Sequence, residues 1–273
     1  MLILENQLDA KGEKIMNNDV IKNIENRLSA QRGHVGFYYR NLVTGDTAGY
    51  NQDEKFLAAS VIKLPIFMCI EKWCSEGKAS MDERIQVKNS GKLPICGALT
   101  LFTDEPWVDI RTLCKLMISL SDNTATNMLI KHYGMENFRT EFPKIGLVNT
   151  ELNRLLFDED ATKKGIENFI VPSEMGRLLW EIYDRSFVSP QVSEEIEEVL
   201  FLQQINHKIP GRIGEDVLIA HKTGEDENLS NDVALVYAKQ PFILCFTGHD
   251  TCVGDFEDLI RRSSEEIFKI CNA

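Results

Sequence analysis

Several features are scarce or missing in this chain of 273 residues, and each absence narrows what the protein can be. No stretch approaches the ~20 consecutive apolar residues of a membrane-spanning helix. The N-terminal sequence MLILENQLDAKGEKIMNNDV has a short apolar start but no basic segment followed by an apolar one, so it does not read as a secretory signal. We therefore expect a cytoplasmic protein, in which residues 1–15 are a disordered or dispensable extension and either Met1 or Met16 is the true start.

A surplus of positive charge is also missing. The chain has 30 Lys and Arg against 42 Asp and Glu, a formal net charge of -12. Such a surface repels phosphate backbones and anionic lipids, so we expect neither a nucleic-acid partner nor a membrane partner. Solubility is the simplest role for the charge. With 43% hydrophobic residues the chain can bury a large core, typical of one large or two ordinary globular domains.

The cysteines lack the pattern of a disulfide framework or a zinc site. They are odd in number, seven, and their spacing is scattered. Most have apolar neighbours, as in FMCIEKWC, which predicts buried free thiols in a reducing compartment. Cys96, in a loop, is expected to be more exposed than the others. The sequence thus indicates no metal and no cofactor, and it identifies no protein partner.

The hydrophobic periodicity divides the chain into three parts. A helical pattern over 17–33 is followed by two strand patterns, 34–42 and 47–51, joined by the turn sequence VTGD. The middle, 57–205, is mostly helical. Short β-rich runs at 217–224, 231–238 and 241–249 then precede an amphipathic helix over 255–271. This order predicts an α/β domain, made of 16–56 together with 206–273, whose antiparallel sheet is flanked by helices. Residues 57–205 would form an inserted all-helical domain, with the active site in the cleft between the two.

The stretch LAASVIKLPIF, residues 57–67, combines a hydroxyl and an amine in an apolar setting. Pro65 is comfortable only near a helix start, which places the helix N-terminus near residues 59–61. Ser60 would then lie in the first turn, and Lys63 would lie on the same face. Desolvation lowers the pKa of such a lysine toward that of a usable base. Ser-x-x-Lys alone is weak evidence, because it is expected about once by chance in a chain of this length. A second example, Ser75 to Lys78, is at a helix end.

Two further triplets strengthen the interpretation. Ser121-Asp122-Asn123 follows a helical run and suggests a turn before the next helix, and Lys222-Thr223-Gly224 ends a predicted strand. Either triplet alone could be a helix cap or a strand-end turn. Each is expected only roughly a few hundredths of a time by chance, so all three in order indicate an active site.

These motifs resemble those of the class A β-lactamases and penicillin-binding proteins, which are active-site serine hydrolases. The stretches SVIKLP, SDNTATN, INHKIPGRI, HKTG and NDVALVY are all similar to that family, and the similarity runs from about residue 17 to the C-terminus. The family fold is the one predicted above. The resemblance implies acylation of a serine by a lactam or amide carbonyl, followed by hydrolysis of the acyl-enzyme.

The resemblance also implies roles for the first two motifs. Ser60 would be the acylating nucleophile, and Lys63 would be its base or help to organise the base. Ser121 would pass a proton to the leaving nitrogen. Asn123 would orient Lys63 and bind the substrate amide.

For the third motif, the resemblance implies that Lys222 supplies positive potential and that Thr223 binds a substrate carboxylate. The backbone N–H groups of Ser60 and Glu225 would form the oxyanion hole. Gly224 would allow close approach of backbone and ligand. No arginine is close to Thr223 in the sequence. His221 is therefore a candidate for binding an anionic substrate, or simply a strand-end histidine.

One family feature is missing. Class A β-lactamases carry Glu-x-x-Leu-Asn in a loop after the second motif, and this glutamate activates the water that releases the acyl group. Counting on from Arg154, and back from Pro172, puts Leu156 in its place. Asp158 or Glu159 could be a substitute base, or both could belong to a solvated acidic loop.

Without that glutamate, deacylation of penicillins is expected to be slow. We therefore predict a β-lactamase-like serine hydrolase acting on a small, carboxylate-bearing β-lactam or acyl-peptide. The alternatives are a D-alanyl-D-alanine-type peptidase, amidase or esterase, and a sensor that binds penicillin without turnover.

Overall fold

Both ends of the chain meet in one sheet. The computed structural model describes residues 18–94 and 96–273, so the predicted extension 1–15 and Met16 lie outside the described residues. The five-stranded sheet has the order β2-β1-β9-β8-β7, and every neighbouring pair is antiparallel. This confirms the predicted antiparallel α/β fold. The strands are β1 (His34–Asn41), β2 (Thr47–Tyr50), β7 (Ile219–Asp226), β8 (Leu229–Val236) and β9 (Phe242–His249).

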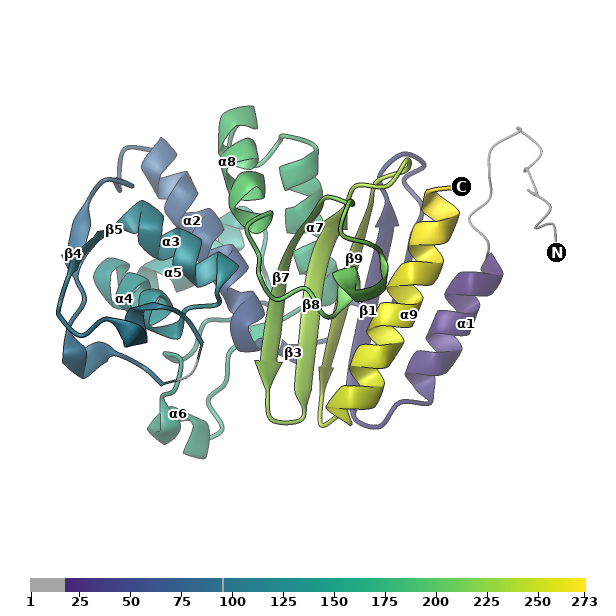
Figure 1. Ribbon diagram of the computed structural model, residues 1–273, viewed down its shortest axis with the longest axis horizontal. Coiled ribbons are helices and arrows are strands. Elements are labelled where there is room, and N and C mark those ends of the chain that lie inside the picture. Colours follow the sequence, from purple (N-terminus) through teal and green to yellow (C-terminus); the bar gives the residue numbers. More distant parts are fainter. Residues whose placement is uncertain (1–17, 95) are drawn as a thin grey trace.

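Two terminal helices cover one face of this sheet (Figure 1). They are α1 (Asn18–Ser29) and α9 (Val253–Cys271), and both show the apolar stripe that the sequence predicts. Ile24 and Ile260 from these helices, and Phe37 and Phe246 from β1 and β9, are completely buried in one hydrophobic cluster. The two ends of the chain are therefore held together by a shared core.

The opposite face packs against α7 (Pro172–Tyr183). Although α7 lies within the predicted helical insert, it contacts β1, β8 and β9 directly. Gly176 makes this close packing possible, because a Cβ there would lie 2.3 Å from the ring of Tyr38. Beyond α7 lie α2 (Lys63–Ser75), α3 (Ile110–Ser119), α4 (Asn123–Tyr133), α5 (Met135–Glu141) and α8 (Pro190–Leu200), which share a second, larger core.

Several short elements went unpredicted, because two or three residues give no periodic pattern. β3 (Phe56–Leu57) pairs with β6 (Phe169–Ile170), and β4 (Arg84–Gln86) pairs with β5 (Trp107–Asp109). The helix α6 (Glu159–Lys163) lies in the predicted acidic loop. The β3–β6 pair matters for the site, since it fixes the chain immediately before Ser60.

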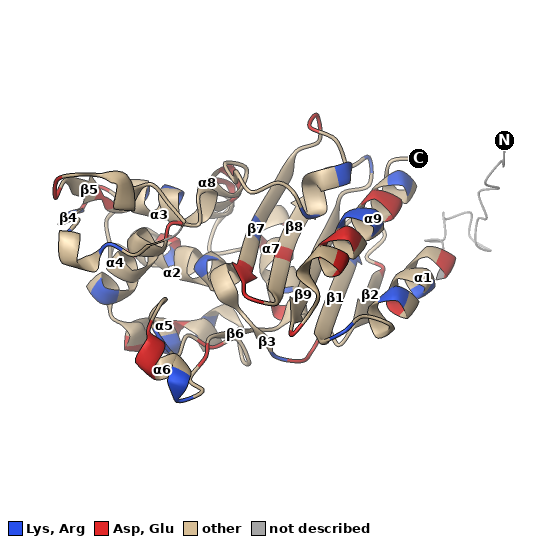
Figure 2. Ribbon diagram, turned by 60° about the horizontal axis from the view of Figure 1, so that its bottom comes forward, with Lys and Arg blue, Asp and Glu red and all other residues tan. Residues whose placement is uncertain are grey.

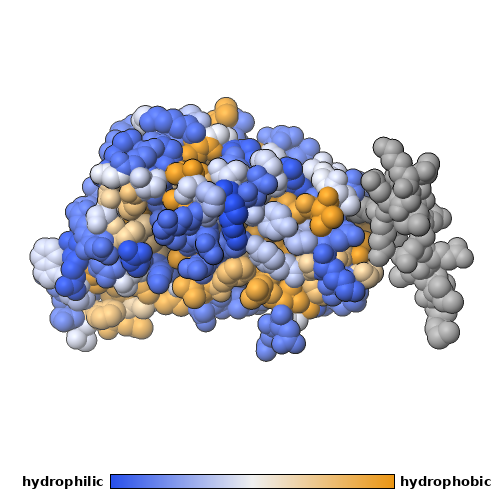
Figure 3. Space-filling model, turned by 90° about the horizontal axis from the view of Figure 1, so that it is seen from above, coloured by the Kyte–Doolittle hydropathy of each residue, from blue (hydrophilic) through white to orange (hydrophobic). Residues whose placement is uncertain are grey.

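The exterior agrees with the composition. Hydrophilic residues cover most of the face seen in Figure 3. In the described residues, none of the helices combines the length and apolarity needed to cross a bilayer. No disulfide joins any of the cysteines in the part of the chain that the structure describes. Cys96 is exposed as expected, but Cys252 is also exposed, because it immediately precedes α9 at the surface and is not in the core.

Candidate active site

Ser60 lies where a 3₁₀ turn, Ala59–Ile62, leads into α2. This confirms the predicted helix start, and Pro65 falls in the first turn of α2, where its missing N–H is harmless. Ala59 has a φ of +40°, which is uncommon for a residue with a side chain. Ser121, from the second motif, has a φ of +54°. Backbone strain of this kind concentrates at functional sites. Ser60 itself is half-buried and lines a pocket of about 710 Å³.

The Lys63 amine is at the centre of a buried polar network. Its Nζ lies 2.8 Å from Ser60 Oγ, 3.0 Å from Ser121 Oγ and 2.7 Å from Asn123 Oδ1. It also donates to the backbone carbonyl of Ser121 at 2.7 Å. Burial, followed by the nearby charge of Lys222, holds the pKa of Lys63 well below its usual value. The structure therefore places a readily deprotonated amine against the Ser60 hydroxyl.

Lys222 reaches the same network from β7. Its Nζ lies 3.1 Å from Ser121 Oγ, so this hydroxyl bridges the amines of Lys63 and Lys222. The Lys222 side chain is completely buried. Burial, followed by the charge of Lys208, lowers the pKa of Lys222 to about 7. The Lys-Thr-Gly triplet lies inside β7 and does not end it, since the strand continues to Asp226 by pairing with β8.

Gly224 explains how β7 comes close to Ser60. A Cβ at Gly224 would lie 3.2 Å from the backbone nitrogen of Ser60 and 3.1 Å from the carbonyl of Ala58. A side chain would push the strand away from Ser60. Asn231 on β8 strengthens the junction, because its amide donates to the carbonyls of Leu57 and Ala58 at 2.9 and 3.1 Å. Sequence reasoning missed this role, which depends on a contact between distant segments.

Lys208 is a second buried cation that sequence reasoning missed. Its Nζ donates to the carbonyls of Gly224 and Asn231 at 3.0 and 3.1 Å, and it pairs with the Glu225 carboxylate at 3.1 Å. The Lys208 side chain is completely buried, so it supports the strand from behind. Its stretch, INHKIPGRI, resembles the family, but no spacing rule identifies a lysine that bonds to strand carbonyls.

The other residues predicted around the third motif divide into two groups. Thr223 and Glu225 line the pocket with Ser60, Ser121 and Asn123. His221 does not, because Asp232 holds its Nδ1 at 3.0 Å and Asn206 holds its Nε2 at 2.9 Å, and the residue is only 1% exposed. His221 is therefore buried outside the set of residues that line the Ser60 pocket.

Leu156 faces the pocket on a firmly held loop. The Asn127 side chain accepts from the backbone N–H of Leu156 and donates to its carbonyl, both at 2.9 Å. Arg154 pairs with Glu167 at 2.7 Å across the loop. The apolar side chain of Leu156 thus lies beside the Ser60 pocket in a fixed position.

The two acidic candidates in this loop differ in position. The Asp158 carboxylate accepts from the Ala161 backbone N–H at 3.0 Å and so caps α6, and Asp158 does not line the pocket. Glu159 lines the pocket, but its side chain is 83% exposed and pairs with Lys163 at 3.4 Å. Neither carboxylate is held against Ser60.

The loop at the mouth of the cleft is tied to the second motif. One carboxylate oxygen of Asp122 accepts from the backbone N–H groups of Ala98 and Leu99, at 2.7 and 2.9 Å. The other caps α4 by accepting from Ala125 at 2.9 Å. Cys96, from the same loop, lines the pocket. Asp122 therefore positions both the loop and the residues Ser121 and Asn123 on either side of it.

One group of potential metal ligands occurs in the described part of the chain. Ligand atoms of His207, Glu225 and Glu257 lie within 4.8 Å of one another. Lys208 and Arg261 already pair with the two carboxylates, at 3.1 and 3.8 Å. This group is outside the network around Ser60, which has a hydroxyl and amines as its reactive groups.

Comparison with known proteins identifies the family. The model of the beta-lactamase enzyme family matches residues 19–270. A beta-lactamase of Rhodobacter capsulatus is 26% identical over 80% of this chain and 74% of its own length. The structure of PBP-A superposes with a TM-score of 0.84 at 27% identity, over 93% of this chain and 96% of that one. A leucine-to-glutamate mutant of PBP-A, solved as an acyl-enzyme complex with penicillin G, has a TM-score of 0.83 at 26% identity, over 93% and 96% of the two chains. The chain belongs to the beta-lactamase enzyme family.

Proposed function

We propose that this protein is a serine hydrolase that is acylated at Ser60 by β-lactams or related amides, and that it releases the acyl group of penicillins slowly. The observation that carries the first part is the set of contacts around Lys63, whose amine lies 2.8 Å from Ser60 Oγ and 3.0 Å from Ser121 Oγ. Leu156, beside the same pocket, carries the second part.

Acylation can be written as a balanced proton cycle. Ser60 Oγ forms a bond to the carbonyl carbon as its proton moves to the neutral Lys63 amine. The backbone N–H groups of Ser60 and Glu225 receive the negative charge on the carbonyl oxygen. The carbon–nitrogen bond then breaks, and Ser121 passes a proton from Lys63 to the leaving nitrogen. Asn123 holds Lys63 in place at 2.7 Å.

The pocket also suits a substrate with a carboxylate. Thr223 lines it, and the buried amine of Lys222 lies behind Thr223 and Ser121. When protonated, Lys222 supplies positive potential at this end of the pocket. A small β-lactam or an acyl-peptide ending in a carboxylate therefore fits better than an uncharged amide.

Deacylation needs a positioned water and a base. Leu156 offers neither, Asp158 is used as a helix cap, and Glu159 is paired at the surface. A leucine-to-glutamate mutant of PBP-A was solved as a penicillin G acyl-enzyme, which supports penicillins as acylating substrates for a protein of this fold. A peptidase or a penicillin-binding sensor also uses the acylation step, and the lifetime of the acyl-enzyme distinguishes these from a β-lactamase with rapid turnover.

Intact-mass spectrometry over time, after addition of benzylpenicillin or a chromogenic cephalosporin, tests the proposal. We expect one adduct of the full penicillin mass that forms on Ser60 and persists over many minutes, with peptide mapping placing it in FLAASVIK. A failure of every β-lactam to give an adduct, or an adduct on Ser75 or Ser121, would overturn the assignment.

A further inference from the structure

The pocket around Ser60 is lined by an unequal set of charges. Acidic residues from two segments face it: the end of β7 with the turn that follows, and the region of α6. Figure 2 shows acidic segments at both places. Basic residues are fewer. The acidic lining residues are Glu159, Glu167, Glu225, Asp226 and Glu227, and the basic ones are Arg154 and Lys163.

Most of these charges are already paired. Arg154 pairs with Glu167 at 2.7 Å, and Lys163 pairs with Glu159 at 3.4 Å. Behind the strand, Lys208 pairs with Glu225 at 3.1 Å, and His207 lies 3.5 Å from the same carboxylate oxygen. Each basic lining residue is therefore balanced by an acidic one.

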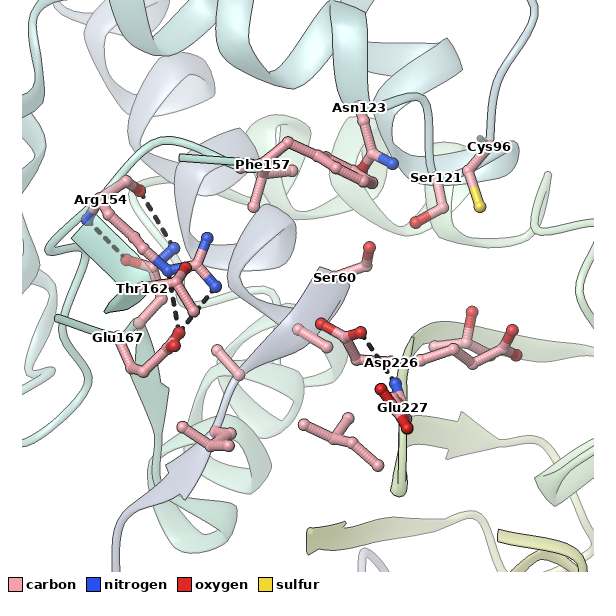
Figure 4. Close-up of a pocket in the computed structure, with 18 of the residues that line it drawn as sticks. Ser60, Cys96, Ser121, Asn123, Arg154, Phe157, Thr162, Glu167, Asp226 and Glu227 are labelled. Carbon is pink, nitrogen blue, oxygen red and sulfur yellow. Dashed lines mark hydrogen bonds and ion pairs between the residues drawn. The ribbon is translucent and has the colours of Figure 1, made fainter. Parts of the chain in front are cut away.

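Asp226 and Glu227 are the exceptions. Within residues 18–94 and 96–273, no cationic group lies within 4.0 Å of either carboxylate. The Asp226 carboxylate accepts from the backbone N–H of Glu227 at 2.8 Å. Figure 4 shows this carboxylate pointing from the end of β7 into the pocket, toward the start of the Ser60 helix. Both residues are exposed, so an incoming ligand can reach them.

The direction of β7 places these acids on a defined side of the substrate. Along the strand, Lys222 and Thr223 come first, then Glu225, and Asp226 is its last residue. Glu227 begins the turn that follows. If the reacting carbonyl lies at Ser60 and Glu225, and the leaving-group carboxylate lies near Thr223, the acyl arm is on the opposite side of the carbonyl, toward residues 226–227. Leu156 and Phe157 line the same pocket and offer apolar surface to that arm.

We infer that Asp226 and Glu227 set a charge preference on the acyl side of this pocket, favouring acyl donors whose arm carries an ammonium group. Acyl donors with a carboxylate on the arm are disfavoured, although the pocket accepts a carboxylate on the leaving side. The substrate class is then an apolar acyl arm bearing an amine, joined through a lactam or amide to a carboxylate-bearing leaving group. This inference rests on the proposed acylation of Ser60.

Three penicillins with one nucleus and one phenyl arm provide a matched test. Ampicillin carries an ammonium group on the arm, benzylpenicillin carries no charge there, and carbenicillin carries a carboxylate. Second-order acylation rate constants are measured by competition with a fluorescent penicillin at low ionic strength. An exposed ion pair is worth a factor of up to about five, and repulsion acts in the opposite direction, so we expect ampicillin to exceed carbenicillin by about tenfold.

The variant Asp226→Asn/Glu227→Gln separates this effect from the intrinsic reactivity of the three compounds. It should reduce the ampicillin-to-carbenicillin ratio about tenfold, and added salt should reduce the parent ratio in the same direction. The control variant Asp82→Asn/Glu136→Gln removes two exposed charges that do not line the pocket, giving the same net charge of -12 + 2 = -10. The control should keep the parent ratio.

The outcomes distinguish the two proposals. Equal rates for the three penicillins, a faster reaction of carbenicillin, or an unchanged ratio in Asp226→Asn/Glu227→Gln would each overturn the charge preference while leaving the acylation of Ser60 intact. A loss of the ratio in the control variant would also overturn it, because general net charge would then be the cause. If none of the three compounds acylates the parent, the proposed function fails, and the charge preference fails with it.

Discussion

Replacing Leu156 with glutamate tests whether slow deacylation has the cause proposed here. The Asn127 side chain holds the Leu156 peptide by two hydrogen bonds of 2.9 Å, and Asn168 Oδ1 accepts from the backbone N–H groups of Asn153 and Arg154 at 2.7 and 3.0 Å. The loop therefore keeps its path when the side chain changes. A glutamate at this position would project into the Ser60 pocket that Leu156 lines.

The expected gain follows from the value of a general base. A positioned base contributes 10²–10⁴-fold, or roughly 2.7–5.4 kcal/mol of barrier. The described loop is not arranged to orient a new carboxylate. We therefore expect a gain at the low end of this range, about 10²-fold in the deacylation rate constant. Leu156 is only partly buried, so its loss should lower the free energy of unfolding by about 1 kcal/mol.

Burst kinetics with benzylpenicillin measure the effect directly. The parent should release about one equivalent of product quickly and then turn over slowly, because the acyl-enzyme accumulates. Leu156→Glu should raise the slow phase and shorten the lifetime of the adduct seen by mass spectrometry. Leu156→Gln is the matched control, since glutamine has the same shape and hydrogen-bonding reach as glutamate but no basic carboxylate.

Two results would refute the reasoning. One is a deacylation rate in Leu156→Glu that is no higher than in Leu156→Gln. The other is rapid penicillin turnover by the parent that is lost in Glu159→Gln or Asp158→Asn while acylation continues. The second result would mean that the acidic residues around α6 supply the base and that the protein is a fully competent β-lactamase.

Further predictions concern the acylation network and the loop held by Asp122. Ser60→Ala should abolish labelling by a fluorescent penicillin while changing the free energy of unfolding by no more than about 1 kcal/mol. Lys63→Ala should lower the acylation rate by at least about 10²-fold in the same labelling assay. The acylation rate should rise with pH as Lys63 loses its proton, then fall as pH increases through about 7, where the pKa of Lys222 lies and its positive charge is lost. Lys208→Met should move this alkaline limb to higher pH, because after burial the charge of Lys208 is the largest cause of the lowered pKa of Lys222. Asp122→Ala should lower the free energy of unfolding by about 2–4 kcal/mol in urea, because it removes a helix cap and leaves two backbone amides of the cleft-mouth loop unpaired.

The sequence was most informative where function depends on short local patterns. Ser60 and Lys63 share a helix face, so their spacing alone predicts their proximity, and the structure places them 2.8 Å apart. The antiparallel sheet was predictable because its strands have strong β patterns and turn signals. α9 was equally clear from its apolar stripe.

Tertiary contacts limited the remaining predictions. Lys208 donates to a backbone carbonyl of β7, and Asn231 donates to one in the segment just before Ser60. Every segment has such carbonyls, so no sequence pattern predicts these contacts. His221 lies in β7 directly before the third motif, but the side chains of Asp232 and Asn206 form hydrogen bonds to its two ring nitrogens. Its burial could be known only once β8 was placed beside β7.

The energetics of the buried lysines bear on what the pocket is for. Lys63, Lys208 and Lys222 are each completely buried, and burial of a cation is costly even when it is well paired. Apolar residues of similar size often stabilise a protein as well or better. The network around Ser60 is therefore poorly explained by stability, and its geometry is that of a nucleophile with a base and a proton carrier. Leu156, which lines the same pocket, has an apolar side chain that can neither accept a proton from a water molecule nor hold that water in place. Since the groups around Ser60 suit acylation and Leu156 offers no base for deacylation, we expect the two steps to differ widely in rate.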